Sequence, residues 1–377
     1  MAGIYLHIPF CKQACHYCDF HFSVNQDRRD QVIDAMILEL EQRRQYLNHE
    51  SVSTIYFGGG TPSILTKSEL TRLLSAIRER FDLESELEIT FECNPDDIDA
   101  DSLNDWRDAG INRLSIGVQS FREIDLKLMN RAHSAAEADS CLEQVRQAGF
   151  DNYTLDLIYG IPDCDDTAWQ SNIEAALAFN PPHISAYCLT IEPKTVFAHW
   201  KRKGKLTEVS PEAAASQFRI LSSVLQAAGI EQYEVSNFAK PGFESLHNSA
   251  YWQGTPYLGV GPSAHSFDRL SRRWNVSNNI RYANSVVNGS KYWEDEVLTL
   301  EDRVNERIMT GLRTRQGLDL VDLQNTTSVD LLQREEALID RLTKEGLAML
   351  FDGSLRLTNE GLLQADRIAS ELFIIES

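Results

Sequence analysis

The sequence has 377 residues, of which 42% are hydrophobic and 24% charged, and a formal net charge of −20. This composition is ordinary for a folded globular protein, and the length accommodates one large domain with a smaller one. The acidic charge argues against binding along a nucleic-acid backbone, and no apolar run reaches the roughly 18 residues of a membrane-spanning helix. The N-terminus lacks the charged and apolar pattern of a secretory leader. We therefore predict a cytoplasmic protein that has no nucleic-acid partner.

Short runs of β-branched and aromatic residues alternate with longer segments of helical spacing over the first 240 residues. Strands are predicted at 4–8, 54–57, 87–91, 113–118, 153–159 and 184–189, with a seventh candidate at 232–235. Helices are predicted between them at 32–47, 69–80, 136–147 and 213–228. Alternating units of this kind form a parallel sheet with right-handed crossovers, so the expected fold is α/β, a partial (β/α) barrel. Ligands of such barrels gather on the loops that follow the strands.

Three regions are expected: the barrel at 1–240, a connecting segment at 241–300 and a smaller C-terminal domain at 301–377. The C-terminal region has helical spacing with one late hairpin, predicted from strands at 347–350 and 355–358 around Asp352-Gly353. Helices followed by a hairpin and another helix resemble a winged-helix unit. Acidic residues outnumber basic ones in this region, so it is not expected to bind DNA.

Three of the seven cysteines, Cys11, Cys15 and Cys18, lie within eight residues as C-x3-C-x2-C. Such crowding indicates metal ligation in a reducing compartment. Thiolates on a short loop suit a [4Fe–4S] cluster, and three of them leave one iron open. Zinc bound with the help of His16 or His21 is the main alternative, and a set of simply buried thiols is a third. The other four cysteines have no ligand spacing and are expected to be buried.

The cysteine loop, with Tyr17 before its last cysteine, resembles that of the radical S-adenosylmethionine superfamily. The flanking segments Tyr5-Leu-His-Ile-Pro-Phe-Cys11 and Cys18-Asp-Phe20 resemble the branch of oxygen-independent coproporphyrinogen III oxidases and haem chaperones. The resemblance implies a [4Fe–4S] cluster with S-adenosylmethionine on its open iron. It also implies a one-electron reductant protein such as flavodoxin or ferredoxin.

Further residues match the S-adenosylmethionine site of that branch. Their chemistry suits the ligand, because an arginine can clamp a carboxylate, a glutamate can contact an ammonium group, and glutamine or aspartate can bind ribose hydroxyls. Each has a structural alternative as a strand-end cap, a tight turn or a surface ion pair. The residues implied by the resemblance are Tyr5, Tyr17, Gly59, Gly60, Thr61, Glu92, Gln119, Arg131 and Asp156.

Two functions follow from the resemblance, and whether the chain is an enzyme stays open at this point. One is oxidative decarboxylation of coproporphyrinogen III. The other is binding of haem and its delivery to a haem-accepting protein, which is either membrane-bound or soluble. The early position of the cysteine loop, Phe20 in place of a further cysteine, and the segment His247-Asn-Ser-Ala-Tyr-Trp252 favour the haem chaperone. His247 is a competent axial haem ligand, and Tyr251 and Trp252 offer flat faces for a porphyrin. Alternatively, this segment packs a loop against the barrel mouth.

Overall fold

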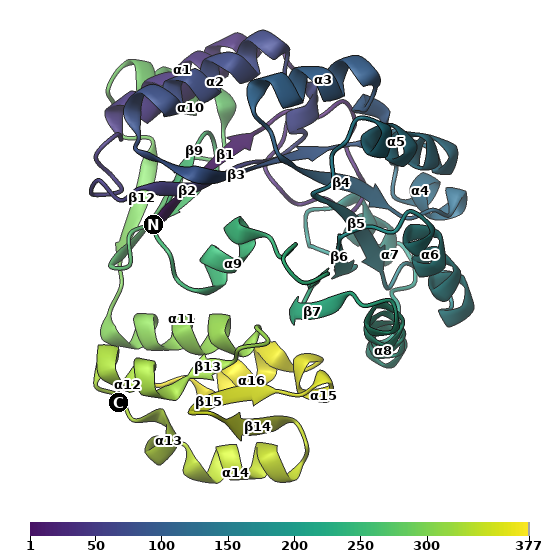
Figure 1. Ribbon diagram of the computed structural model, residues 1–377, viewed down its shortest axis with the longest axis vertical. Coiled ribbons are helices and arrows are strands. Elements are labelled where there is room, and N and C mark those ends of the chain that lie inside the picture. Colours follow the sequence, from purple (N-terminus) through teal and green to yellow (C-terminus); the bar gives the residue numbers. More distant parts are fainter. Residues whose placement is uncertain (376–377) are drawn as a thin grey trace.

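A computed structural model of the chain, which describes residues 1–375, contains a curved twelve-stranded sheet and a separate three-stranded sheet (Figure 1). Six neighbouring strands of the large sheet run parallel in chain order, which confirms the predicted α/β fold. They are β1 (Ala2–Ile8), β2 (Val52–Gly59), β3 (Leu83–Cys93), β4 (Arg113–Gln119), β5 (Tyr153–Tyr159) and β6 (His183–Cys188).

Further strands extend both sides of this parallel set, and the two ends of the described sheet do not pair with each other, so the barrel is partial. Beside β6 lies the antiparallel strand β8 (Asn237–Ala239), followed by β7 (Glu231–Glu234), which corresponds to the seventh candidate strand. Residues 241–300, expected to be a connection, contribute four strands on the β1 side of the same sheet. These are β9 (Tyr257–Val260), β10 (His265–Phe267), β11 (Ser271–Asn275) and β12 (Trp293–Val297).

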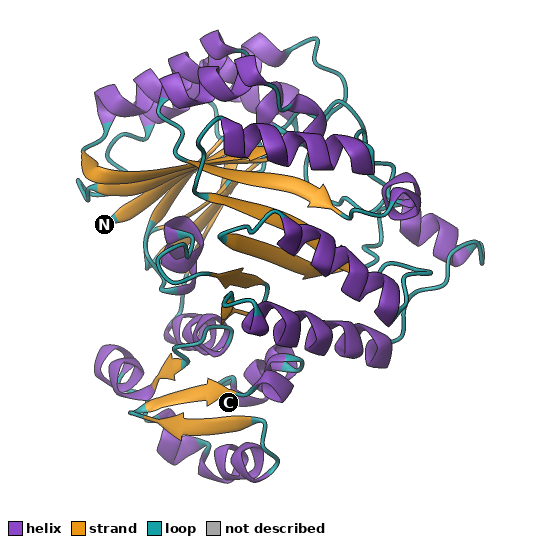
Figure 2. Ribbon diagram, turned by 45° about the vertical axis from the view of Figure 1, so that its right-hand side comes forward, coloured by secondary structure: helices purple, strands orange, loops and turns teal. Residues whose placement is uncertain are grey.

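Helices cover the convex side of the sheet (Figure 2). Local signals fix their ends: Thr66 and Glu69 form a capping box, and Gly110 ends a helix with a φ of 99°. The helices of this layer are α1 (Arg29–Gln42), α2 (Lys67–Arg80), α3 (Ala100–Ala109), α4 (Glu123–Leu128), α5 (Ala135–Gln147), α6 (Asp166–Ala178), α7 (Val196–Arg202), α8 (Pro211–Ala227) and α10 (Asn279–Val287). No helix within residues 1–375 is long and apolar enough to cross a membrane.

The inner wall of the barrel is polar, although its outer wall is apolar. On β1, Ile4 and Leu6 are fully buried, whereas Tyr5 and His7 line an inner cavity, because side chains alternate between the two faces of a strand. Layers of apolar side chains fill a closed barrel. Here the polar inner positions leave a cavity of about 670 Å³ whose walls include Thr54, Arg113, Ser115, Thr154 and Ser185.

Helix α9 (Leu246–Trp252) lies between the barrel and the C-terminal domain (Figure 1). That domain has its own apolar core, and its predicted hairpin is confirmed, with Asp352 and Gly353 at φ values of 49° and 76° in a two-residue turn. Its elements are α11 (Leu300–Leu312), β13 (Leu318–Asp319), α12 (Leu320–Thr327), α13 (Leu331–Arg334), α14 (Glu336–Lys344), β14 (Ala348–Phe351), β15 (Ser354–Leu357), α15 (Asn359–Leu362) and α16 (Ala365–Leu372).

Candidate functional site

The three clustered cysteines lie on the loop that follows β1, and all three are free and partly exposed. Backbone hydrogen bonds hold both ends of this loop: the Cys11 N–H donates to the Ser23 carbonyl (3.1 Å), and the His16 N–H donates to the Met129 carbonyl (3.0 Å). His16 also bonds the Leu128 carbonyl through Nδ1 (2.9 Å). The loop is therefore shaped by the chain around it, and His16 serves that loop structure.

The chemistry of this donor set fits an iron–sulfur cluster. Burial raises the pKa of Cys11 to about 11 and that of Cys18 to about 12, so a bound metal must displace these protons. Within residues 1–375, no three His, Cys, Asp or Glu side chains are gathered closely enough to hold a single metal ion. Three thiolates on one loop can each bind a separate iron of a cuboidal cluster.

Arg131 joins the cysteine loop to strand β4. Its Nη1 lies 3.4 Å from both the Cys15 sulfur and the Tyr17 hydroxyl, and its Nη2 donates to Asn94 Oδ1 (2.6 Å) and the Gly117 carbonyl (2.8 Å). The Nε atom is buried without a partner. A buried guanidinium with a free donor beside the cluster loop fits an anionic group such as a carboxylate.

The turn after β2 lies against the chain that leads into the cysteine loop. The Gly60 N–H donates to the Ile8 carbonyl, and the Thr61 N–H donates to the Phe10 carbonyl, both at 2.8 Å. A Cβ atom on Gly60 would lie 2.6 Å from the Ile8 oxygen, and Gly59 has a φ of 106°. These glycines are required because the two backbones approach too closely for side chains.

Glu92, near the end of β3, forms a polar wall beside this turn. Its carboxylate accepts from the Tyr56 hydroxyl (2.9 Å) and from the Gly59 N–H (3.2 Å). Burial raises the pKa of Glu92 to about 7. The Tyr5 ring stacks on Tyr56 at 6.0 Å between centroids, and its hydroxyl lies 3.2 Å from His7 Nδ1. This wall could bind the ammonium group of a ligand through Glu92.

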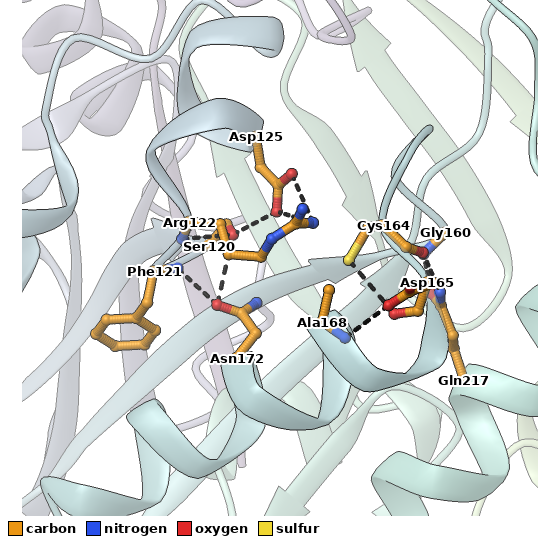
Figure 3. Close-up of polar contacts among 10 residues, drawn as sticks. All are labelled: Ser120, Phe121, Arg122, Asp125, Gly160, Cys164, Asp165, Ala168, Asn172 and Gln217. Atoms are coloured by element: carbon orange, nitrogen blue, oxygen red, sulfur yellow. Dashed lines mark hydrogen bonds and ion pairs between the residues drawn. The ribbon is translucent and has the colours of Figure 1, made fainter.

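Gln119 ends β4 in a left-handed conformation, with a φ of 65°, which is uncommon for residues other than glycine. The loop that follows is firmly held (Figure 3): the Ser120 hydroxyl donates to Asp125 (2.8 Å), and Asn172 accepts from the Phe121 N–H (2.6 Å). A Cβ on Gly117 would meet the Gln119 amide nitrogen at 2.9 Å. Strain held in this way is a feature of ligand sites.

Asp156 lies in the middle of β5 and faces the interior of the barrel. Its Oδ2 accepts from the Ser115 hydroxyl (2.9 Å), and burial raises the pKa of Asp156 to about 6. The loop after β5 is held by Gln217 of α8, which accepts from the Gly160 N–H and donates to the Cys164 carbonyl, both at 2.7 Å (Figure 3). Glu92 on β3, Gln119 on β4 and Asp156 on β5 therefore lie on the inner face of the sheet.

His247 projects from α9 into the cavity. Its Nδ1 lies 2.8 Å from Thr54 Oγ1, and its ring centroid lies 5.0 Å from that of Tyr56. Its backbone N–H donates to Glu88 (2.9 Å). Burial lowers the pKa of His247 to about 4, so the imidazole is neutral. Its Nε2 has no hydrogen-bond partner in the described part of the chain. A neutral imidazole with one nitrogen fixed and the other free is arranged as a metal ligand.

The two aromatic residues that follow have different surroundings. Tyr251 is 45% exposed and lines the cavity. Trp252 is absent from the described cavity wall, and the Arg313 guanidinium of the C-terminal domain lies 5.2 Å from its ring centroid. Phe20, 68% exposed, stands at the opposite end of the cavity, next to the cysteine loop.

Sequence reasoning missed several residues of this site. Tyr56, Asn94 and Arg113 were unassigned, although Tyr56 and Arg113 occupy inward positions of strands whose alternation was visible. Three of the remaining cysteines are buried as expected. Cys188 is exposed, so that expectation was wrong; it ends β6 at the open end of the barrel.

Comparisons with known proteins agree with this geometry. Residues 5–172 match the Radical SAM superfamily, and residues 298–363 match the HemN C-terminal domain. The solved structure of Coproporphyrinogen III oxidase (HemN) from Escherichia coli has a TM-score of 0.85 at 26% identity, over 99% of this chain and 90% of that chain. The fold is thus that of a radical S-adenosylmethionine protein, whose cofactors are a [4Fe–4S] cluster and S-adenosylmethionine.

The curated relatives narrow this class. Heme chaperone HemW of Bacillus subtilis (strain 168) is 33% identical over 98% of this chain and 98% of its own length. Heme chaperone HemW of Escherichia coli (strain K12) is 39% identical over 70% of this chain and 69% of its own. The chain belongs to the HemW family of radical S-adenosylmethionine proteins.

Proposed function

We propose that this chain is a cytoplasmic haem chaperone that binds haem in the barrel cavity and delivers it to a haem-dependent acceptor protein. The observation that carries the proposal is His247, a neutral imidazole whose free Nε2 faces a cavity of about 670 Å³. A cavity of this size is in the range of small-molecule and cofactor sites. Tyr56, Tyr251 and Tyr257 supply aromatic surface around that nitrogen, and such surface suits a porphyrin.

The contacts of Trp252 support a structural role for this residue, whereas the sequence predicted that it contacts haem. Its ring meets Arg313 and does not line the cavity, so we assign it to holding α9 against the C-terminal domain. Of the three residues expected from the sequence to bind haem, we assign direct contact to His247 and Tyr251.

We assign the [4Fe–4S] cluster to Cys11, Cys15 and Cys18, and the S-adenosylmethionine site to the residues converging beside them. When bound, these cofactors supply one-electron chemistry. Arg131 orients the methionyl carboxylate, and Glu92 accepts from its ammonium group. Other residues complete the pocket, through close approach of the backbone, hydrogen bonds to the ribose hydroxyls or aromatic stacking. They are Tyr5, Tyr17, Gly59, Gly60, Thr61, Gln119 and Asp156.

A small acidic electron carrier such as flavodoxin or ferredoxin is the proposed reductant, and a basic segment beside the cysteine loop supports this. Residues 193–207 contain five Lys or Arg and no Asp or Glu, in a chain with a net charge of −20. Helix α7 of this segment packs on the loop, with the Trp200 and His16 ring centroids 4.7 Å apart. Three of its exposed side chains have no ion-pair partner within residues 1–375: Lys194, Lys203 and Lys205.

The second candidate function is oxygen-independent oxidation of coproporphyrinogen III, favoured by the likeness to the Escherichia coli oxidase structure. Phe20 opposes it by resemblance, because the oxidases have a further cysteine at this position.

The decisive experiment is anaerobic reconstitution of the cluster, followed by separate assays with haem and with coproporphyrinogen III. A chaperone binds haem stoichiometrically and passes it to an apo-haemoprotein. Robust decarboxylation without haem binding would overturn the proposal, and an unchanged haem spectrum in His247→Ala would remove His247 from it.

A further inference from the structure

Arg113 is a buried cation without a partner. Arg43 and Arg113 are the two buried arginines in the described part of the chain. Arg43 forms an ion pair with Glu39 (3.2 Å) and also donates to the Gly259 carbonyl and to Ser266, both at 3.0 Å. Arg113 is only 2% exposed, its side chain has no hydrogen bond or ion pair within residues 1–375, and its Nε is fully buried. An unpaired buried charge is costly, which indicates that an absent anion completes this site.

Asp156 is near enough for Arg113 to lower the pKa of its carboxyl against the effect of burial, but no carboxylate of the barrel interior lies within ion-pair distance of Arg113 in residues 1–375. Glu88 accepts from the N–H groups of Leu246 and His247 at 3.0 and 2.9 Å. Asp156 accepts from Ser115, and Glu92 accepts from Tyr56 and from the turn after β2. The Arg113 guanidinium therefore lines the cavity without a direct ion pair, and Asp156 acts on its charge only from a distance.

The position of Arg113 on its strand separates it from the cluster. It begins β4, whereas Gln119 ends that strand beside Arg131 and the cysteine loop. At about 3.3 Å per residue, the two ends of β4 lie about 20 Å apart. Arg113 pairs in register with Thr90, two residues beyond Glu88, which binds the first turn of α9. Arg113 thus lies at the His247 end of the cavity, away from the expected methionyl carboxylate.

We propose that Arg113 binds a carboxylate of the ligand held against α9, namely a propionate group of the porphyrin. This inference rests on the proposed haem-binding function. A guanidinium binds a carboxylate through two parallel hydrogen bonds, and the surrounding low dielectric strengthens them. The contact fixes the orientation of the porphyrin, while His247 approaches its iron.

The test compares haem with haem dimethyl ester, in which both propionates are esterified, on the full-length chain with reconstituted cluster. Wild-type protein is expected to bind haem at least about tenfold more tightly than the diester, as expected for a charge-assisted bond. In Arg113→Met this preference disappears. The matched control is Arg272→Met, which removes another cavity-lining arginine that is paired with Glu306, and it keeps the preference.

A second measurement guards against misfolding. The ligand-free Arg113→Met chain is expected to unfold at a urea concentration no lower than wild type, because it loses an unpaired buried charge. Arg113→Gln repeats the haem comparison with a different neutral side chain. A preference that persists in both variants overturns the assignment.

Separate outcomes distinguish the source of the carboxylate and the failure of the wider proposal. If Arg113→Met weakens binding of S-adenosylmethionine about tenfold while the haem preference persists, the carboxylate is methionyl and the propionate assignment is wrong. If wild-type protein binds haem and diester equally, the haem function stands and this assignment fails. Binding of neither porphyrin overturns both.

Discussion

The Nδ1 atom of His247 lies 2.8 Å from Thr54 Oγ1, and this contact joins helix α9 to the second strand of the barrel. The backbone N–H of the same residue donates to Glu88 on the third strand (2.9 Å). Glu88 therefore fixes the backbone of His247 and Thr54 fixes its imidazole, which leaves the second ring nitrogen free at the cavity. The orientation of a metal-binding histidine is commonly set by the partner of its other nitrogen.

Thr54→Val should weaken haem binding while the protein remains folded. Valine keeps the shape of threonine but removes the bond to His247, and one such hydrogen bond is worth about 1 kcal/mol, or about fivefold in affinity. Haem titration followed by absorbance measures the change. Ser53→Ala, one residue earlier on the same strand, is the control and should bind haem like wild type. Equal affinity in Thr54→Val would show that Thr54 does not orient the ligand.

Glu92 should make the stability of the ligand-free chain depend on pH. Burial raises its pKa from 4.5 to about 7, so the folded state favours the protonated carboxyl. Its contribution is fully present below pH 4.5 and is lost as the pH rises through about 7, by about 3 kcal/mol. Urea unfolding at several pH values should show a loss larger by this amount in wild type than in Glu92→Gln, in which the buried Asp156 still titrates. Parallel pH profiles of the two proteins would contradict the assigned burial.

Arg131→Met should reduce the affinity for S-adenosylmethionine by about ten- to a hundredfold, since charged hydrogen bonds contribute about 1.5–3 kcal/mol. Iron and sulfide content should stay near wild type, because backbone bonds rather than Arg131 hold the ends of the cysteine loop. Equilibrium dialysis against labelled ligand measures the affinity. Lys127→Met, at an exposed neighbouring cation, should change neither quantity. Retained affinity in Arg131→Met would remove this residue from the ligand site.

Trp252 and Tyr251 should respond differently to substitution. Trp252→Leu removes the contact with Arg313 and should lower the free energy of unfolding by about 1–3 kcal/mol, while the haem spectrum stays unchanged. Tyr251→Leu should instead weaken haem binding with little loss of stability, since Tyr251 is partly exposed on the cavity wall. A haem spectrum altered only by Trp252→Leu would reverse these two roles.

Charge reversal on the basic segment should slow reduction of the cluster by a protein but not by a small molecule. The triple variant Lys194→Glu, Lys203→Glu and Lys205→Glu should lower the rate with reduced flavodoxin about tenfold at low salt, with little effect at high salt. Stopped-flow bleaching of the iron–sulfur absorbance measures this rate, and dithionite should reduce both proteins equally. The control carries the same charge change elsewhere, at Arg146, Arg334 and Lys344. Equal slowing in both triple variants would place the flavodoxin contact elsewhere.

The predictable parts of this protein are those that depend on local spacing. The cysteine loop, the strand at 153–159 and the Asp352-Gly353 turn each require only a few consecutive residues, and the structure has all three. The segment 241–300 was less predictable, because its short strands join the sheet only through the tertiary pairing of β9 with β1. The same limit applied to Asn94, whose contact with Arg131 spans 37 positions.

The sequence by itself indicated the class of cofactor, because three thiols on one loop suit an iron–sulfur cluster and the segments around them resemble those of the radical S-adenosylmethionine superfamily. Only the tertiary structure decided which side chains meet at the cavity. Strand register and the packing of α9 bring Thr54, Glu88 and His247 together, and neither is encoded in local spacing. The same packing turns Trp252 toward Arg313 and leaves Arg113 unpaired, because charge balance in a buried site depends on every element that surrounds it.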